Sequence, residues 1–140
     1  MTQQRLRRQV EAILEANGMK WTEDDGRLAM RFDSALVHVA LYEWGSQQLI
    51  TIGSNVLQEI PSLPGGNLPI LSAVNDLNLA TSFGKWVYQD DCRTIFLEYE
   101  LLGDNLQEPE LMTALAAIAR LADRHDDMLQ AKLGGHKSFE

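Results

Sequence analysis

The most regular alternation of apolar and polar residues lies between Gly84 and Gly103, and it predicts a two-stranded β-hairpin. A turn at Asp91-Cys92 would bring apolar residues together on one face and set a lysine opposite a glutamate on the other. The predicted pairs are Asp90 with Arg93, Tyr88 with Ile95, Trp86 with Leu97, Lys85 with Glu98 and Val87 with Phe96. One register places the apolar pairs on one face and the charge pair on the other. We therefore expect this hairpin to organise the sheet.

Residues 19–58 also alternate, and turn residues interrupt them at regular intervals, at 24–26, 33–34 and 45–46. This pattern predicts a four-stranded antiparallel meander. The apolar pairs expected on its buried face are Phe32 with Ala35, Met30 with Val37, Leu28 with Val39, Leu41 with Ile50 and Val39 with Ile52.

The strand residues that alternate with the buried ones form a second face, which we call the outer face. Its larger apolar residues are Leu36, Tyr42, Trp44, Leu49, Val87 and Phe96. A sheet face open to water is mainly polar, so we expect something to cover part of this one. The alternatives are the middle helix, a second copy of the chain or a bound peptide, and the six residues are our candidate partner or dimer surface.

Helical spacing of apolar residues predicts three helices. The first covers residues 6–17 and stops at Asn17-Gly18, the second opens with Asn67 as a capping residue and Pro69 in its first turn, and the third ends at Gly134-Gly135. The element order is α-β(3 to 4)-α-β(2)-α. We therefore predict an α+β fold with an antiparallel sheet and helices packed mainly on one face, as a single domain over residues 1–135 with a flexible tail at 136–140.

Composition narrows the class of protein. The chain has 140 residues, 45% of them hydrophobic, and 20 acidic against 12 basic residues give a net charge of −8. This charge opposes binding to nucleic acid. The single cysteine, Cys92, cannot form an internal disulfide, which favours a cytoplasmic location. No apolar run is long enough for a signal peptide or for insertion into a membrane.

Two groups of residues imitate known catalytic or metal sites. Ser82 and Lys85 match a Ser-x-x-Lys signature of acyl enzymes, but a helix-to-strand turn is the wrong context for it. His125 lies among Asp123, Asp126 and Asp127, a composition compatible with metal binding. Because His125 occupies the apolar stripe of its helix while its neighbours point elsewhere, we expect a packed histidine.

Glu98 and Glu100 lie two residues apart on one strand, roughly 7 Å at about 3.4 Å per residue, a separation compatible with an acid/base pair. A charged outer face explains them more simply, because Lys85 is opposite Glu98. The sequence contains no glycine-rich phosphate loop, nucleophile elbow or Cys-x-x-Cys motif. We therefore predict no catalytic residue, no cofactor and no metal.

Several segments together resemble the YbjN-type domain, a family grouped with type III secretion chaperone-like folds and labelled a bacterial sensory transduction regulator. The resemblance covers nearly the whole chain, although His125 stands where the family often has a larger apolar or aromatic residue. The matching segments are the hairpin from Gly18 to Phe32, Leu77-Asn78, Phe83 to Tyr88, Ile95 to Tyr99 and Ala122 to Leu129.

The resemblance implies a small, acidic, cytoplasmic protein, often dimeric, whose relatives in the fold bind extended segments of partner proteins. It carries over no catalytic residue. Our leading hypothesis is a non-enzymatic, chaperone-like bacterial protein that forms a homodimer and holds a protein segment on apolar surface. The alternatives are a small-ligand sensor with a pocket between the sheet and the middle helix, and an enzyme that uses Glu98 and Glu100.

Overall fold

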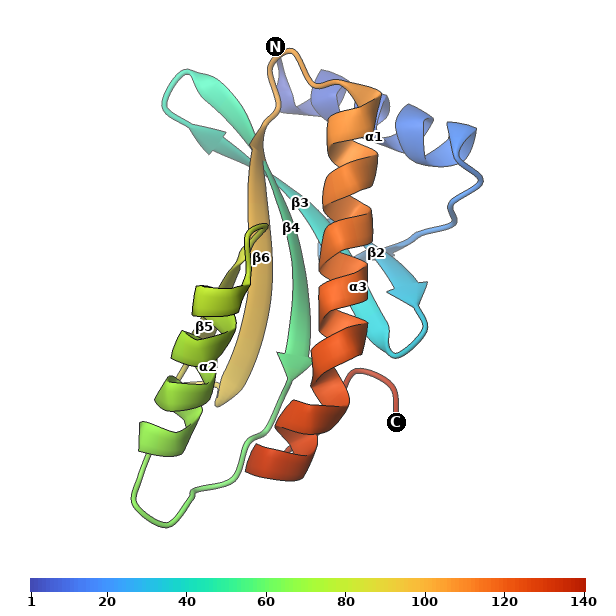
Figure 1. Ribbon diagram of the computed structural model, residues 1–140. Coiled ribbons are helices and arrows are strands. Elements are labelled where there is room, and N and C mark those ends of the chain that lie inside the picture. Colours follow the sequence, from blue (N-terminus) through green and yellow to red (C-terminus); the bar gives the residue numbers. More distant parts are fainter.

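The computed structural model describes residues 1–140 as three helices and one six-stranded antiparallel sheet. Figure 1 shows their arrangement. The helices are α1 (Gln3–Ala16), α2 (Leu68–Ala80) and α3 (Glu108–Leu133). The strands are β1 (Thr22–Asp24), β2 (Arg27–Phe32), β3 (Ala35–Trp44), β4 (Gln47–Leu57), β5 (Lys85–Gln89) and β6 (Thr94–Leu102). The predicted α+β class and element order are confirmed, with four strands in the meander.

The strands in the sheet follow the order β1-β2-β3-β4-β6-β5, so β6 joins the C-terminal hairpin to the meander. All the strand pairs predicted for the hairpin and the meander are present. At the hairpin turn, the Arg93 N–H donates to the Asp90 carbonyl at 3.2 Å. The predicted register is therefore correct within the hairpin and within the meander.

One hydrophobic core unites the three helices with one face of the sheet. Leu6 of α1, Ile70 of α2 and Leu111 of α3 belong to the same buried cluster as Val39 and Ile52 of the sheet. None of the six outer-face residues belongs to this cluster. In Figure 1, α2 lies over β5 on the same side of the sheet as α3. The middle helix therefore does not cover the outer face, because its buried side chains are used on the opposite one.

Local chemistry sets the ends of the helices. The Thr2 hydroxyl accepts a hydrogen bond from the Arg5 N–H at 3.2 Å and caps α1. Gly18, with φ of +68°, follows the end of α1 as predicted. At the start of α3, the Gln107 backbone N–H donates to Glu110 Oε1 at 3.1 Å.

The start of α2 differs in one detail from the sequence prediction. Asn67 precedes the helix, but its side chain makes no capping hydrogen bond. Instead, its amide donates to Asp90 Oδ1 at 2.8 Å and its oxygen accepts from Arg93 Nη1 at 3.4 Å. Asn67 therefore binds the hairpin turn. The charged residues of this turn compete with the N–H groups of α2 for the Asn67 side chain. Pro69 lies in the first turn as predicted.

The long helix α3 confirms its predicted apolar stripe. Its buried residues include Leu111, Leu115, Ile118, Leu129 and Leu133. His125 is half-buried and meets the Trp86 ring edge-on, with centroids 5.7 Å apart, as expected for a packed histidine. No helix of the chain combines the length and the apolarity that a membrane span requires.

Two aspartates of α3 hold the turn between β2 and β3. Asp123 Oδ1 accepts from the Ser34 backbone N–H at 3.1 Å and also from its hydroxyl. These bonds lower the pKa of Asp123. Asp126 also contacts the Ser34 hydroxyl and is only 2% exposed. Asp123 and Asp126 thus have a structural role in joining α3 to the sheet.

Residues 136–140, which the sequence predicts to be a flexible tail, contact the end of the sheet. His136 and Gln58 exchange two backbone hydrogen bonds of 2.8 Å. The Ser138 hydroxyl donates to the Asn55 carbonyl at 3.1 Å, and the Phe139 ring lies 3.8 Å from the Arg31 guanidinium carbon. These contacts bring the tail against β4, while its flexibility stays a prediction.

Candidate functional site

The outer face carries an exposed apolar group at the end of the β3–β4 hairpin. Register places Tyr42, Leu49 and Leu102 in one row across β3, β4 and β6. Tyr42 is 52% exposed, Leu102 50%, and Trp44, next to them at the tip of β3, 63%. We call these four residues the hairpin patch. Sequence reasoning missed Leu102, because its place in the row depends on the pairing of β4 with β6.

The other predicted surface residues lie elsewhere on the outer face. Val87 and Phe96 pair with each other, and Phe96 also pairs with Asn55 of β4. Leu49 and Asn55 are six residues apart on β4, about 20 Å at roughly 3.3 Å per residue. Leu36, near the start of β3, is half-buried like Val87 and Phe96. The structure therefore does not gather the six predicted residues into a single patch.

A shallow hollow of about 110 Å³ lies between these two apolar groups. Gly53 of β4 lines it, opposite His38 on β3 and Glu98 on β6. Tyr42 borders the hollow from the side of the hairpin patch, and Phe96 from the other side. We call it the central hollow. It makes the outer face a continuous surface with an apolar group at either end.

The charged groups around the central hollow include two carboxylates that share one lysine and an arginine paired with an aspartate. Lys85 Nζ lies 3.5 Å from Glu100 Oε1 and 4.0 Å from Glu98 Oε2. At the other side, Arg27 Nη2 lies 3.3 Å from Asp24 Oδ2.

His38, 7% exposed, also borders the central hollow. Its Nε2 lies 3.4 Å from Asp24 Oδ2 without a hydrogen bond. Burial, and secondarily the Arg27 charge, lower the pKa of His38 below 6.5 although Asp24 opposes them. The imidazole is therefore neutral at pH 7 and adds no charge to the hollow.

Side-chain amides bind free backbone groups at the edge strand β5 and on the interior strand β3, where β2 ends. Asn78 of α2 donates to the Trp86 carbonyl at 2.9 Å and accepts from the Trp86 N–H at 2.8 Å, so it occupies the free edge of β5. Gln3 of α1 donates to the Leu41 carbonyl at 2.9 Å, beyond the last pair of β2 with β3. An incoming strand would have to displace these bonds. The outer face is more accessible to a partner than these backbone groups are.

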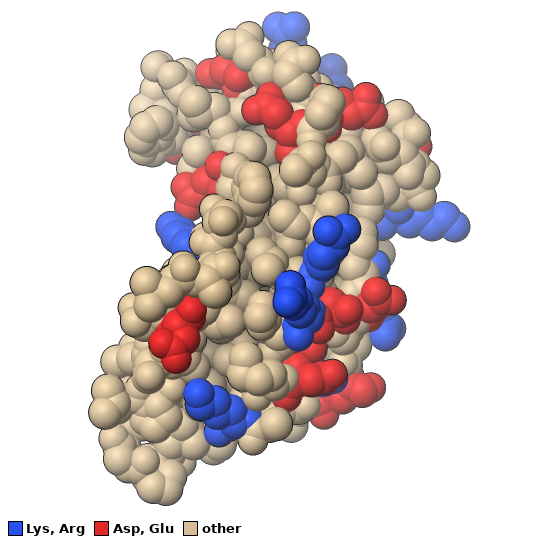
Figure 2. Space-filling view, in the orientation of Figure 1, with Lys and Arg blue, Asp and Glu red and all other residues tan.

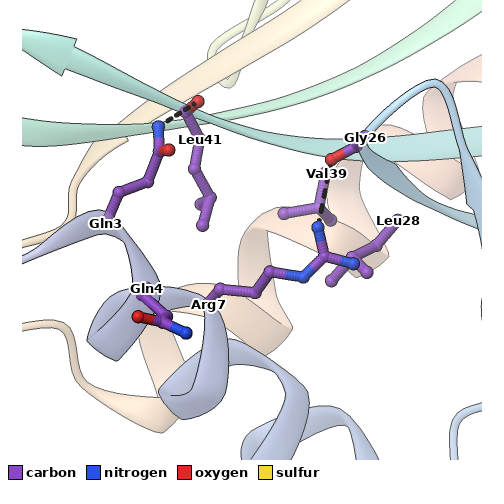
Figure 3. A pocket seen from close by; sticks show the side chains of 7 residues that line it. All are labelled: Gln3, Gln4, Arg7, Gly26, Leu28, Val39 and Leu41. Carbon is purple, nitrogen blue, oxygen red and sulfur yellow. Dashed lines mark hydrogen bonds between the residues drawn. The ribbon is translucent and has the colours of Figure 1, made fainter.

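A second hollow, of about 260 Å³, lies between α1 and the sheet (Figure 3). Leu28, Val39 and Leu41 form its apolar side. Arg7 crosses it and donates to the Gly26 carbonyl and to Glu23 Oε1, both at 3.2 Å. The Arg7 guanidinium, the most polar group of this hollow, is therefore already paired.

The sensor hypothesis places a ligand between the sheet and the middle helix. Ile70, Val74 and Leu77 of α2 and Trp86 of β5 belong to the packed core. These side chains occupy the space in which a ligand of the proposed sensor would have to lie.

Helix α2 has a second apolar side that faces solvent. Leu68, Leu71 and Leu79 recur at helical spacing and are 73%, 52% and 80% exposed. We call these residues the α2 stripe. Asp76 is the only charged residue of α2, and Figure 2 shows a mostly uncharged surface over this helix. An apolar helix side depleted of charge is typical of a protein interface.

The residues considered for catalysis do not assemble into a reactive site. Lys85 Nζ lies near Glu98 and Glu100, so the lysine contacts carboxylates and no hydrogen bond links it to Ser82. His125 packs on Trp86. No group of three or more His, Cys, Asp or Glu side chains is placed to hold a metal ion.

Comparison with known proteins gives the family. The sequence profile described as "T3SS (YopN, CesT) and YbjN peptide-binding chaperone 1" matches residues 3–140. The chain belongs to this TY-Chap1 family. The resemblance to YbjN found in the sequence is thereby confirmed. No curated protein matches the sequence as a relative.

Solved structures share the TY-Chap1 fold at low sequence identity. A chain of the ExsC–ExsE complex has a TM-score of 0.62 at 16% identity, and the match covers 86% of this chain and 93% of that one. YbjN from E. coli has 0.59 at 14%, covering 86% and 90%. The Yersinia pestis type III secretion chaperone SycH, in complex with a YscM2 fragment, has 0.53 at 16%, covering 81% and 93%. The type III secretion chaperone-like fold is thus confirmed.

Proposed function

We propose that this protein is a peptide-binding chaperone that holds an extended segment of a partner protein on the outer face of its sheet and has no catalytic activity of its own. The observation that carries the proposal is the hairpin patch, four neighbouring apolar residues that no helix covers. Exposed apolar patches of this kind mark interaction sites. Family membership supports a peptide as the partner.

The outer face offers contacts along its length. A segment that begins on Trp44 and Leu49 would cross the central hollow and reach Phe96 and Val87, about 20 Å away. Six to seven extended residues span that distance at roughly 3.3 Å each. Apolar groups at both ends would anchor the segment, and the side-chain amides on the edge of β5 and on the unpaired end of β3 disfavour strand addition there.

We further propose that the protein is a cytoplasmic homodimer that associates through the α2 stripe. A chain with a net charge of −8 repels a second copy except where the contacting surfaces lack charge. The α2 stripe meets this condition, with Asp76 as the one charge on its helix. It also lies on the opposite side of the sheet from the proposed peptide surface, so both contacts can form together.

Peptide selection tests the proposed function. Phage-displayed random 12-residue peptides would be selected on the immobilised protein, and the enriched peptides measured by fluorescence anisotropy. Trp44→Ser should weaken their binding at least tenfold, because the largest exposed side chain of the hairpin patch is lost. Leu68→Ser, a change of an exposed apolar residue on the α2 stripe, is the matched control and should bind as the wild type does.

Two results would contradict the proposal. If the wild-type protein enriches no peptide, it does not have the proposed peptide-binding function. Peptides that bind Trp44→Ser and wild type equally would remove the hairpin patch as the binding surface. Circular dichroism of Trp44→Ser should match the wild type, since this side chain lies outside the core.

A further inference from the structure

Gly53 lies in the middle of the outer face, near the centre of β4, and nothing within the chain requires a glycine there. It does not have a positive φ. A Cβ at this position would lie 3.4 Å from the Leu97 carbonyl oxygen and 3.8 Å from Glu98 Cγ, which are ordinary contacts. Glycine in a strand interior weakens the strand, and it often marks a place where a ligand approaches the backbone closely.

Gly53 lines the central hollow and places no side chain in it. Its neighbours in register are His38 on one side and Glu98 on the other, so the hollow lies between an imidazole and a carboxylate. Their strands are separated by two strand spacings, roughly 10 Å. The hollow of about 110 Å³ thus accommodates one side chain rather than a larger ligand.

The surroundings of the hollow favour a positive charge. Glu98 and Glu100 share one lysine, Lys85, and the longer of the two distances, 4.0 Å, is that to Glu98. On the other side, Arg27 is balanced by Asp24 at 3.3 Å. The three carboxylates and two cations together therefore leave one negative charge in excess. The Phe96 ring also borders the hollow, and aromatic faces attract cations.

We propose that the central hollow is a specificity pocket that receives one lysine or arginine side chain from the bound segment. Its aliphatic stem would lie over Gly53 and Ala40 against Phe96, and its charged end would pair with Glu98. The inference rests on the proposed function, because it names the side chain that the segment presents midway between its two apolar anchors.

A positional peptide library tests the pocket. Acetylated and amidated nine-residue libraries, random except for Lys, Arg, Leu, Gln or Glu fixed at the central position, would be measured by fluorescence anisotropy against the full-length protein. The wild type should bind the Lys and Arg libraries at least tenfold more tightly than the Glu library. Gly53→Ala should lose this preference while its melting temperature stays equal or rises, because its Cβ fills the hollow without a clash.

A charge variant provides an independent measurement. Glu98→Gln keeps the glycine and removes the carboxylate, so the Lys and Arg libraries should then bind no better than the Gln library. Glu43→Gln makes the same chemical change on β3 outside the hollow and should keep the preference. If Gly53→Ala fails to fold, the preference measured for Glu98→Gln tests the pocket by itself.

The outcomes separate this inference from the proposed function. Wild-type protein that binds libraries without preferring Lys or Arg, or variants Gly53→Ala and Glu98→Gln that keep the preference, would overturn the pocket while leaving peptide binding in place. Wild-type protein that binds none of the libraries would overturn both.

Discussion

Asn78 binds both backbone groups of Trp86, and the Trp86 indole N–H donates to the Thr81 hydroxyl at 3.0 Å. One short segment at the end of α2 thus fixes the backbone and the side chain of a buried tryptophan. This arrangement satisfies polar groups at a sheet edge that would otherwise pair with another strand. At the residue scale, the edge of β5 is therefore closed by a side chain and not by another strand.

We expect two histidines to make the stability of the protein depend on pH. Burial lowers the pKa of His125 and of His38 below the ordinary value of 6.5. The unfolded chain consequently binds more protons than the folded one as the pH falls through 6.5. We expect the free energy of unfolding to be highest above this value and to decrease between pH 7.5 and 5.5, measured by urea denaturation at constant ionic strength.

The double variant His38→Gln/His125→Gln should have a flatter pH profile over the same range, whatever its absolute stability. An unchanged slope would contradict the assignment to these two side chains. Asp123 titrates in a different window, because Ser34 lowers its pKa and the corresponding stability is lost only as the pH falls below about 4.

At the scale of elements, the C-terminal tail forms an isolated backbone bridge to Gln58, just beyond the end of β4. Deleting residues 136–140 removes two backbone hydrogen bonds to Gln58 and the contact of Phe139 with Arg31. Two such bonds are worth roughly 1–3 kcal/mol together. We expect the deletion to lower the free energy of unfolding in urea by about this amount.

A point variant separates the bridge from the rest of the tail. His136→Pro lacks the N–H that donates to Gln58 and should reproduce part of the loss. If the deletion leaves the urea midpoint unchanged, the tail is flexible in solution, as its sequence predicts.

The whole molecule presents two separate apolar surfaces, the hairpin patch and the α2 stripe, on opposite sides of the sheet. Sedimentation equilibrium across concentration should find a dimer for the wild type. The double variant Leu71→Ser/Leu79→Ser should be a folded monomer, because both side chains are exposed in the single chain and lie outside its core.

Trp44→Ser is the matched control for this experiment and should remain dimeric. A dimer that dissociates with Trp44→Ser instead would make the hairpin patch the self-association surface. A wild type that is monomeric at all concentrations would contradict the homodimer.

The strand registers and the packed position of His125 could be predicted because they depend on neighbours in sequence. Two-residue periodicity and turn residues set Trp86 opposite Leu97 and Leu28 opposite Val39. The surface was harder to predict. Leu102 was missed, and the distance between Leu49 and Phe96 became visible only once β6 was placed beside β4.

By itself, the sequence determined the helices, the two hairpin systems and the α+β class, since apolar periodicity and turn chemistry act over a few residues. Only the tertiary structure decided which face α2 covers, how the outer apolar residues divide and where Gly53 leaves a hollow. These features arise where β4 meets β6 and where α2 folds back onto β5. Such contacts join residues far apart along the chain, and local patterns do not specify them.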